Sequence, residues 1–306
     1  MTTNMSSGPA TNTATDLATV VSQTAIGRPI TKRGVAIFPV YRPGSTGVTA
    51  TLARPGKNFD VREKATPTVP ILEVENSGDA PVVLFAGETL EGGRQQRVLN
   101  QSVIIPAHTV TDIPVSCVEQ GRWHGSHKFD GVGEMAPPSI RRSANRRDQG
   151  AVWNSVDVLL SERHLTSHTS ALDAYFQSLP DSPDMAAIDE VTSWGPLPQQ
   201  TGIVVMNRGE VVSLDLFGNE TLLASMWETL VRSALVSGTS TSKSTTNRAD
   251  KALNFLRRFT REVRGPLGRS DFGLGQWRQV TTDRVTGQVL ALDDQLVHAS
   301  AFPGGR

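Results

Sequence analysis

The sequence predicts an α+β fold: an N-terminal antiparallel β-sandwich-like sheet followed by a mixed half of helices and strands, the two forming one compact unit. Strand-like apolar runs fill the first part of the chain, at 35–40, 69–75, 82–85, 98–105 and 110–118. Helical spacing of apolar residues begins only after residue 150. Strands that come first, with helices gathered later, are typical of an α+β protein.

Composition narrows the classes of partner. The 306 residues carry 30 basic and 30 acidic side chains, so the formal net charge is zero. A neutral chain lacks the general positive field that attracts nucleic-acid duplexes and anionic membranes, so we expect neither partner. One cysteine cannot form an internal disulfide, and no apolar run approaches the ~20 residues that span a bilayer. We expect a soluble cytoplasmic protein, and the composition leaves a homo-oligomer open.

The chain divides into three predicted parts. Residues 1–25 are rich in Thr, Ser, Asn and Ala with little periodic apolar signal, which predicts a flexible arm. Residues 30–124 form a β-rich half, in which a turn at 76–79 separates two strands. Residues 125–303 form the α+β half, and their Ser/Thr-rich stretch at 238–247 is expected to be a mobile loop.

Periodicity predicts the elements of the α+β half. Residues 125–149 show no regular pattern and are expected to be irregular. Apolar residues at helical spacing predict four helices, at 151–164, at 170–179, at 222–235 after a capping Asn219, and at 253–263. Apolar runs separated by turn residues predict two hairpins, at 202–217 and 288–302.

The densest polar chemistry lies in residues 87–100, GETLEGGRQQRVLN. Glycines bring bare amides near a ligand, arginines fork onto a phosphate or carboxylate, and carboxamides suit ribose hydroxyls or a base edge. A carboxylate in such a segment can bind a diol or act as a general base. The candidate ligand-binding residues are Glu88, Gly92, Gln95, Gln96, Arg97 and Asn100, with Glu91 as a candidate catalytic residue. The alternative is a Gly-Gly hairpin whose Glu–Arg network only fixes the fold.

A second polar segment, residues 116–124, reads SCVEQGRWH. Cys117 is a candidate nucleophile, with His124 or His127 as its base and Glu119 as the group that orients the base. A lone cysteine at the end of a β-branched strand is more often a small buried hydrophobe, so the inert interpretation is favoured. Glu119 is also a candidate acid or base, and Trp123 can stack on a sugar or base or anchor its loop. The other candidate ligand-binding residues are Gln120, Arg122, His124 and Gln149. No paired metal-ligand spacing occurs, so no metal and no cofactor are expected.

Both polar segments resemble the motifs of a prokaryotic family. Residues 87–100 are similar to the pattern Gly-Glu-x-x-x-Gly-Ala/Gly-x-Gln-Asn-Arg-x-Leu-Asn, and residues 113–123, IPVSCVEQGRW, to the pattern Ile-Pro-Val-Ser-Cys-Val-Glu-x-Gly-Arg-Trp. The family is the ADP-ribosylglycohydrolase (ARG) and rhodanese-phosphatase-associated protein domain family. Gln96 stands where that family usually has Asn, and a looser likeness covers about residues 30–303.

The resemblance implies a link to ADP-ribose or NAD-derived metabolism, in stress or defence, without implying a particular reaction. The leading hypothesis is a protein that binds an ADP-ribose-like or other phosphorylated nucleotide ligand between the two segments. Arg97 and Arg122 would hold phosphate, and Glu91 or Glu119 would serve hydrolysis of an N-glycosidic or phosphoester bond. The alternatives are a non-catalytic sensor or effector with the same pocket, and a protein-interaction module whose polar segments are structural. Convergence of the Gln95, Arg97, Glu119 and Arg122 side chains is the geometric test of the pocket.

Overall fold

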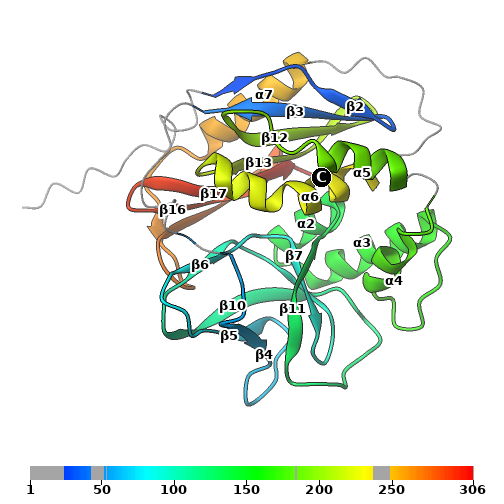
Figure 1. Ribbon diagram of the computed structural model, residues 1–306, viewed down its shortest axis with the longest axis vertical. Helices are drawn as coiled ribbons and strands as arrows, with labels where there is room; N and C mark the ends of the chain where they lie inside the picture. The colour runs from blue at the N-terminus through cyan, green and yellow to red at the C-terminus, as the bar shows by residue number, and fades with distance from the viewer. Residues whose placement is uncertain (1–23, 43–51, 53, 183–184, 237–248, 306) are drawn as a thin grey trace, which may run out of the picture.

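The computed structural model describes residues 24–42, 52, 54–182, 185–236 and 249–305. They form two stacked parts: a large sheet with helices, and below it a smaller group of strands (Figure 1). Most of the predicted flexible arm and the predicted mobile loop at 238–247 lie outside the described residues. Within the described chain, no helix is both long enough and apolar enough to cross a membrane.

The large sheet has nine antiparallel strands drawn from both ends of the chain. Their order is β1-β3-β12-β13-β17-β16-β15-β14, and β2 pairs with β3 beside this path. The strands are β1 (Ala25–Ile26), β2 (Ile30–Lys32), β3 (Val35–Tyr41), β12 (Gln200–Asn207), β13 (Glu210–Phe217), β14 (Gly268–Arg269), β15 (Gln276–Thr281), β16 (Val285–Leu292) and β17 (Gln295–Pro303). The hairpins β12–β13 and β16–β17 lie where the sequence predicts them.

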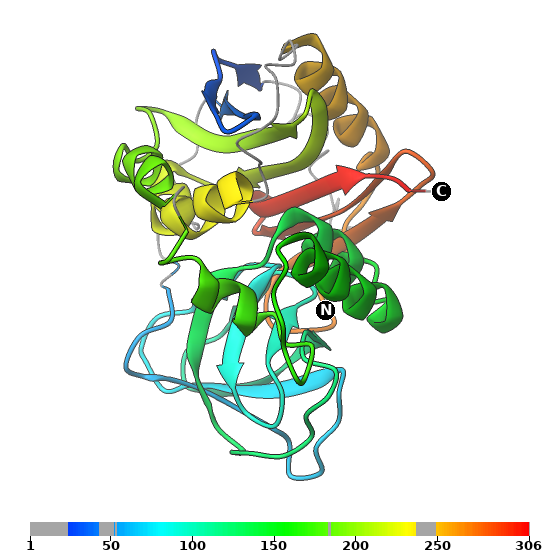
Figure 2. The same ribbon diagram turned by 90° about the vertical axis from the view of Figure 1, so that its right-hand side faces the viewer.

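Both faces of the large sheet are buried. Val35 and Ile37 of β3 contact one core while Ala36 and Phe38 contact another, because successive side chains of a strand point to opposite faces. Figure 2 shows helices α6 and α7 on opposite sides of this sheet. The helices of the described residues are α2 (Pro138–Asn145), α3 (Gln149–Glu162), α4 (Asp173–Ser178), α5 (Met185–Ser193), α6 (Glu220–Val236) and α7 (Ala249–Glu262).

The helices that cover the sheet follow the predicted apolar spacing. Helix α7 buries Ala252, Phe255, Leu256 and Phe259, three or four residues apart, against the outer face. Helix α6 starts after Asn219, whose side-chain oxygen accepts the Leu222 N–H at 2.8 Å. That hydrogen bond satisfies an amide at the helix N-terminus that has no partner inside the helix.

The smaller part carries both polar segments. Its six-stranded sheet has the order β11-β7-β8-β10-β5-β4, and β6 and β9 form a separate pair above it. The strands are β4 (Phe59–Arg62), β5 (Ile71–Asn76), β6 (Val82–Leu84), β7 (Glu88–Gly92), β8 (Arg97–Leu99), β9 (Val103–Ile105), β10 (Thr109–Cys117) and β11 (Phe129–Met135). A third core, which includes Leu72, Leu99 and Ile113, fills this part.

The α+β class is confirmed, and three details differ from the expectations. Strand β3 joins β12 of the large sheet rather than the strands that follow it, so the chain does not divide at residue 124 into two consecutive halves. The run 98–105 splits into β8 and β9, because residues 100–102 turn away to bond the large sheet. Residues 125–149, expected to be irregular, hold β11 and α2, and β11 forms only through its pairing with β7.

Candidate functional site

A cleft of about 450 Å³ opens at the side of the smaller part, and both polar segments line it. Glu91, Gly92 and Gln96 come from the first segment, and Glu119 and Arg122 come from the second. The remaining lining residues belong to β11 and to the chain around α4; they are Asp130, Ser167, Thr169, Ala171, Asp173, Ala174 and Gln177.

Strand pairing brings the two polar segments together. Cys117 of β10 lies opposite Arg97 of β8, and Leu90 of β7 lies opposite Arg97 on its other side. The two segments are therefore neighbours in one sheet although some twenty residues of chain separate Arg97 from Cys117. This is the arrangement expected of polar residues at the ends of paired strands.

The second segment also pairs with the chain before α4. The Gly121 N–H donates to the Thr169 carbonyl at 2.9 Å, and the Leu172 N–H donates to the Val118 carbonyl at 2.9 Å. A Cβ at Gly121 would lie 2.9 Å from the Thr169 Cα, so glycine permits the close approach. These backbone bonds place Thr169 and Asp173 across the cleft from Glu91.

Glu119 is the centre of the hydrogen-bond network of the cleft. Arg122 donates to both of its carboxylate oxygens, at 2.8 and 2.7 Å, the Gln96 N–H donates at 3.1 Å and the Thr169 hydroxyl at 3.0 Å. Burial alone would raise the pKa of Glu119, but these hydrogen bonds outweigh it and hold the pKa below its usual value. Glu119 is therefore an ionised, fixed carboxylate.

Glu91 has the opposite environment. Partial burial raises the pKa of its carboxyl, and the negative charges of Asp173, Glu134 and Asp130 raise it further. The carboxylate lies over Gly133 of β11, where a side chain would collide with it. Two carboxyl groups with pKa values shifted in opposite directions thus face one cleft, as in acid–base sites.

Gln96 carries an unsatisfied carboxamide. Its side chain is 3% exposed, it lines the cleft, and neither its amide nitrogen nor its amide oxygen has a hydrogen-bond partner among the described residues. Buried polar groups without partners are uncommon and costly, so each one calls for an explanation. A bound ligand that both donates and accepts would satisfy both atoms.

The glycine pair of the first segment makes room for side chains of β11. Gly92 has φ +89°, and a Cβ there would lie 2.7 Å from the Asp130 carboxylate. Gly93 has φ +62°, and the Phe129 ring fills the place of its missing side chain. Gly92 lines the cleft, and the torsions of the pair let the chain turn at the end of β7 close to the side chains of its neighbour β11.

Gln95 and Arg97 lie behind the cleft wall. The Gln95 side-chain amide donates to the Glu119 carbonyl at 2.8 Å, and Arg97 donates to the Gln95 carbonyl at 2.8 Å. Arg97 is 0% exposed and also contacts Glu63, with N and O 3.5 Å apart. The four side chains chosen as the geometric test therefore converge in one network, but Arg97 lies outside the cleft and is not placed to hold phosphate.

Cys117 is a buried, neutral thiol. Burial raises its pKa, and the thiol donates to the Glu119 carbonyl at 2.9 Å. Gln149 clamps the same residue: its side chain accepts the Cys117 N–H at 2.8 Å and donates to the Cys117 carbonyl at 2.7 Å. Neither side chain lines the cleft. The structure thus agrees with the inert interpretation of Cys117 and gives Gln149 a positioning role.

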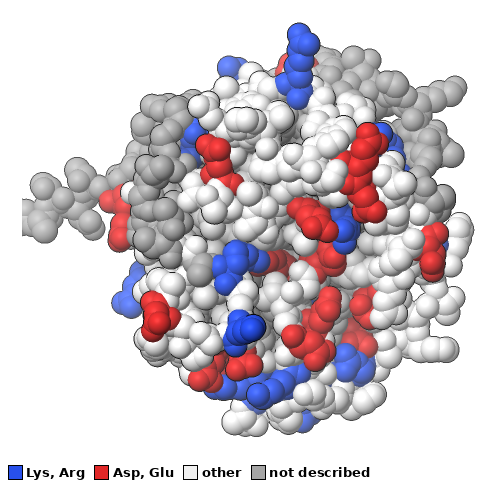
Figure 3. Space-filling view, viewed as in Figure 1, with Lys and Arg blue, Asp and Glu red and all other residues white. Residues whose placement is uncertain are grey.

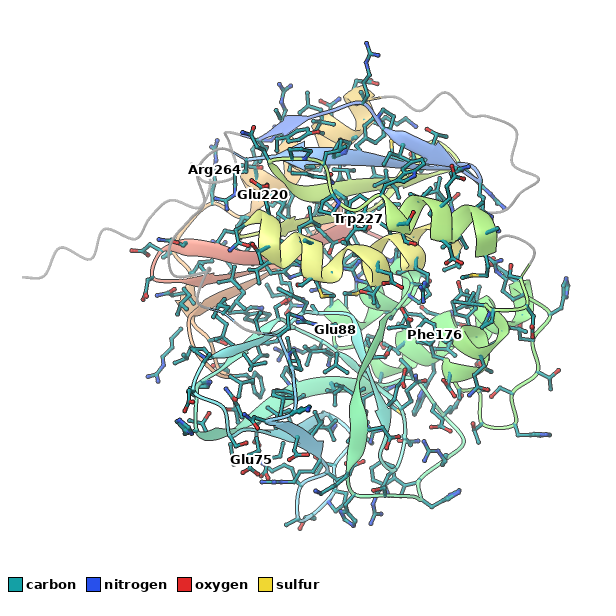
Figure 4. The ribbon with its side chains drawn as sticks, viewed as in Figure 1. Glu75, Glu88, Phe176, Glu220, Trp227 and Arg264 are labelled. Atoms are coloured by element: carbon teal, nitrogen blue, oxygen red, sulfur yellow. The ribbon has the colours of Figure 1, made fainter. Side chains whose placement is uncertain are left out.

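Glu88 and Asn100 face the large sheet instead. Glu88 lies at the centre of the molecule, where its two parts meet (Figure 4), pairs with Arg54, and accepts the Phe85 N–H at 2.5 Å. The Asn100 carbonyl accepts the Gln288 side-chain amide of β16 at 2.9 Å. The first segment is therefore divided between a cleft wall and a structural lock.

The last candidates, Gln120, Trp123 and His124, are close in sequence to Arg122 but do not line the cleft. Gln120 and His124 are exposed, and the His124 carbonyl accepts a hydrogen bond from Arg122 at 3.1 Å. Trp123 is 43% exposed, and its ring lies 5.6 Å from the Arg97 guanidinium. A face of the indole thus covers a buried cation, which corresponds to the loop-anchoring interpretation of Trp123.

Seven lining residues were absent from the sequence-based candidates: Asp130, Ser167, Thr169, Ala171, Asp173, Ala174 and Gln177. Asp173 lies in the first turn of α4. Acidic residues are common there because the positive end of the helix dipole stabilises them, so its position in the sequence does not indicate a site. No sequence motif identifies these residues, because they reach the cleft only through the backbone pairing of their segments with the two polar segments.

The comparisons with known proteins agree with the two segments. Residues 23–302 match the family model described as the ARG and Rhodanese-Phosphatase-superfamily-associated Protein domain. No curated protein matches the chain, and no solved structure matches it.

Proposed function

The chain belongs to the ARG and Rhodanese-Phosphatase-superfamily-associated Protein domain family, and on that premise we propose that its cleft binds the ribosyl part of an ADP-ribose-like ligand and hydrolyses the bond between ribose and nitrogen. The observation that carries the proposal is the pair of carboxyls in one cleft, Glu91 with a raised pKa and Glu119 with a lowered one. Sites that cleave glycosidic bonds use two carboxyl groups whose environments set their pKa values apart and give them different roles.

Each group has a defined role in this proposal. Gln96 donates to and accepts from the ribose hydroxyls, which satisfies both of its unpartnered amide atoms. Ionised Glu119 stabilises the positive charge that develops at the anomeric carbon. The carbon–nitrogen bond breaks with its electron pair remaining on nitrogen, water adds to the anomeric carbon, and Glu91 accepts the proton that the water loses.

The charges in the cleft favour this bond over a phosphoester. Among the described lining residues Arg122 alone is basic, and Glu119 already engages its guanidinium through two hydrogen bonds. Phosphoryl transfer relies on cations that neutralise the phosphoryl oxygens. A cleft with four carboxyl groups repels a phosphate and accommodates an uncharged sugar.

Incubation with NAD and with ADP-ribosylated peptides, followed by mass spectrometry, tests the proposal. The wild type is expected to release ADP-ribose. Stabilisation of the fold by NAD without any product would support the non-catalytic sensor instead, because a ligand that binds only the native state raises its apparent stability. Absence of both product and stabilisation would refute the cleft as a ribosyl site.

Replacing Gln96 by leucine separates ligand binding from folding. Leucine has a similar volume and removes two buried atoms that lack partners, so Gln96→Leu is expected to leave the melting temperature unchanged or raise it. NAD affinity is expected to fall roughly tenfold or more, because the hydrogen bonds to the ligand are lost. Calorimetric titration and thermal unfolding give the two quantities. A loss of stability with unchanged affinity would show that the carboxamide serves the fold.

Asp173→Asn is expected to shift the pH profile of turnover. Burial is the largest cause of the raised pKa of Glu91, and the charge of Asp173 is the second. Glu134 and Asp130 of β11 raise it further. Removing the Asp173 charge lowers the pKa of Glu91. The carboxylate therefore stays ionised, and able to act as a base, to a lower pH, and the acid limb of the kcat/KM profile shifts to lower pH. Asp157→Asn, on the exposed face of α3, is the matched control and leaves that limb in place.

The same variant has a stability signature. The pKa values of Glu91 and Asp173 are raised in the folded state, so the fold loses stability as pH rises from the unfolded pKa through the folded one. At neutral pH Asp173→Asn removes that repulsion and is expected to raise the melting temperature by about 1–2 °C, since partly exposed charge contacts contribute below ~1 kcal/mol. A lower melting temperature at neutral pH would contradict this assignment.

A further inference from the structure

The cleft has an excess of negative charge that the protein does not neutralise. Four acidic residues line the cleft: Glu91, Glu119, Asp130 and Asp173. Among the described lining residues, Arg122 is the single basic one. Figure 3 shows acidic side chains gathered over the region of β11 in the lower half of the molecule. The acidic residues come from three strands or their ends and from α4, so the fold itself assembles the charge.

Only one of these carboxylates forms an ion pair with a described residue. Glu119 forms its ion pair with Arg122 at 2.7 Å. Glu91, Asp130 and Asp173 form no ion pair with any described residue, and Asp173 accepts a hydrogen bond from the neutral side-chain amide of Gln177. Other acidic residues of the smaller part are neutralised locally: Arg62 bridges Glu73 and Glu75, and Lys64 pairs with Asp112. Asp60 of β4 forms no ion pair with a described residue, but it is exposed and lies outside the cleft.

An acidic cluster alone does not define a ligand, but Gln96 adds an independent requirement. Its two unpartnered amide atoms lie at the wall of the same cleft and need a neutral donor and a neutral acceptor. The unpaired carboxylates need a positive charge, because like charges placed near one another are unfavourable. A single ligand that presents hydroxyls next to a cationic nitrogen meets both requirements.

We propose that the cleft selects ribosides whose glycosidic nitrogen carries a positive charge, with Asp130 and Asp173 as the residues that recognise the cation. The inference rests on the proposed function and names its substrate class. A cationic nitrogen leaves the anomeric carbon as a neutral group once the electron pair of the broken bond returns to it, so departure requires no proton from the protein. The added water then yields the sugar hydroxyl and one proton, which passes to Glu91.

A matched pair of ligands tests the preference. Carbocyclic nicotinamide riboside is a cation whose ring oxygen is replaced by a methylene group, which prevents hydrolysis through an oxocarbenium ion. Its dihydropyridine form is neutral and nearly the same shape. Calorimetric titration of the wild-type protein is expected to show binding of the cation about tenfold tighter than that of the neutral form, with the difference shrinking as salt is added.

Variants assign the preference to the cleft. The double variant Asp130→Asn/Asp173→Asn is expected to bind both forms within about twofold of each other, while Glu75→Gln on β5 keeps the wild-type preference. Equal binding of both forms by the wild type, or tighter binding of the neutral form, would overturn the charge selection. Such a result leaves the proposed function intact, because release of ADP-ribose from NAD tests that function separately. Retention of the preference in the double variant would also overturn the assignment.

Discussion

Arg141→Met is expected to lower the free energy of unfolding by about 3–5 kcal/mol, because it leaves Asp215 as a buried charge without its partner. Arg141 is 2% exposed and Asp215 is 0% exposed, and the guanidinium of α2 forks onto the carboxylate of β13. Burial alone would raise the pKa of Asp215, yet Arg141 holds it below its usual value, so both groups are ionised in the folded state. Urea unfolding followed by tryptophan fluorescence measures the loss.

Two further variants decide the cause. Arg142→Met changes the neighbouring arginine, which is half-buried and forms no ion pair with a described residue, and is expected to cost less than about 1 kcal/mol. The double variant Arg141→Met/Asp215→Leu removes both charges and is expected to recover most of the stability. A loss at Arg141 no larger than at Arg142 would mean that the buried pair does not anchor α2 to the large sheet.

The same pair belongs to a wider lock between the two parts. His298 of β17 lies 3.6 Å from Asp215 and 2.7 Å from the Ser102 hydroxyl, which also accepts the Ala86 N–H. The three residues Ser102, His298 and Asp215 resemble a catalytic triad in type, but all are fully buried, with the His298 ring between Phe85 and Phe217. Burial lowers the pKa of His298, so it remains a neutral structural group.

Glu91→Gln is expected to lower kcat for release of ADP-ribose from NAD by about 10²–10⁴-fold, the range typical of a lost general base. Glutamine keeps the size and hydrogen-bonding capacity of the side chain but cannot accept the proton from water. The fold is expected to remain intact or to gain a little stability, because the repulsion from Asp173, Glu134 and Asp130 disappears. Initial rates by mass spectrometry and a melting curve measure the two effects.

The control is Glu75→Gln, a carboxylate at the lower end of the molecule in Figure 4 that pairs with Arg62 on the surface. It is expected to retain the wild-type rate. A Glu91→Gln protein that turns over NAD at more than a third of the wild-type rate would remove Glu91 from the chemistry. An unfolded Glu91→Gln protein would contradict the placement of this side chain at the cleft surface.

Regular periodicity explains why much of the fold was predictable. The apolar spacing of α6 and α7, the Asn219 cap and the two late hairpins each depend on residues close together in sequence. The pairing of β3 with β12 and of β11 with β7 was not predictable in this way. Those strands are defined by partners far away in the chain, and the glycines of β11 give it no apolar alternation.

The meeting of the two polar segments at one cleft was predictable because they flank strands that pair. It was not predictable which residues of these segments line the cleft and which ones join the two parts of the molecule. A sequence does not distinguish a buried arginine that supports a carboxylate from an arginine that binds phosphate. The sequence therefore predicts a phosphate-binding role for Arg97, whereas its side chain is buried behind the wall of the cleft. Asp173 reaches the cleft because the chain before α4 forms backbone hydrogen bonds with residues 118 and 121. Backbone hydrogen bonds of this kind cannot be predicted from residue types.

The most direct test of the account is a crystal structure of the Glu91→Gln variant soaked with NAD, which the inactive protein should leave intact. The expected result places the ribose bound to the nicotinamide in the cleft, hydrogen-bonded to the Gln96 carboxamide, with the pyridinium ring beside Asp130 and Asp173. NAD bound elsewhere on the molecule, with Gln96 still without a ligand partner, would contradict the claim that the two polar segments together form a ribosyl-binding site.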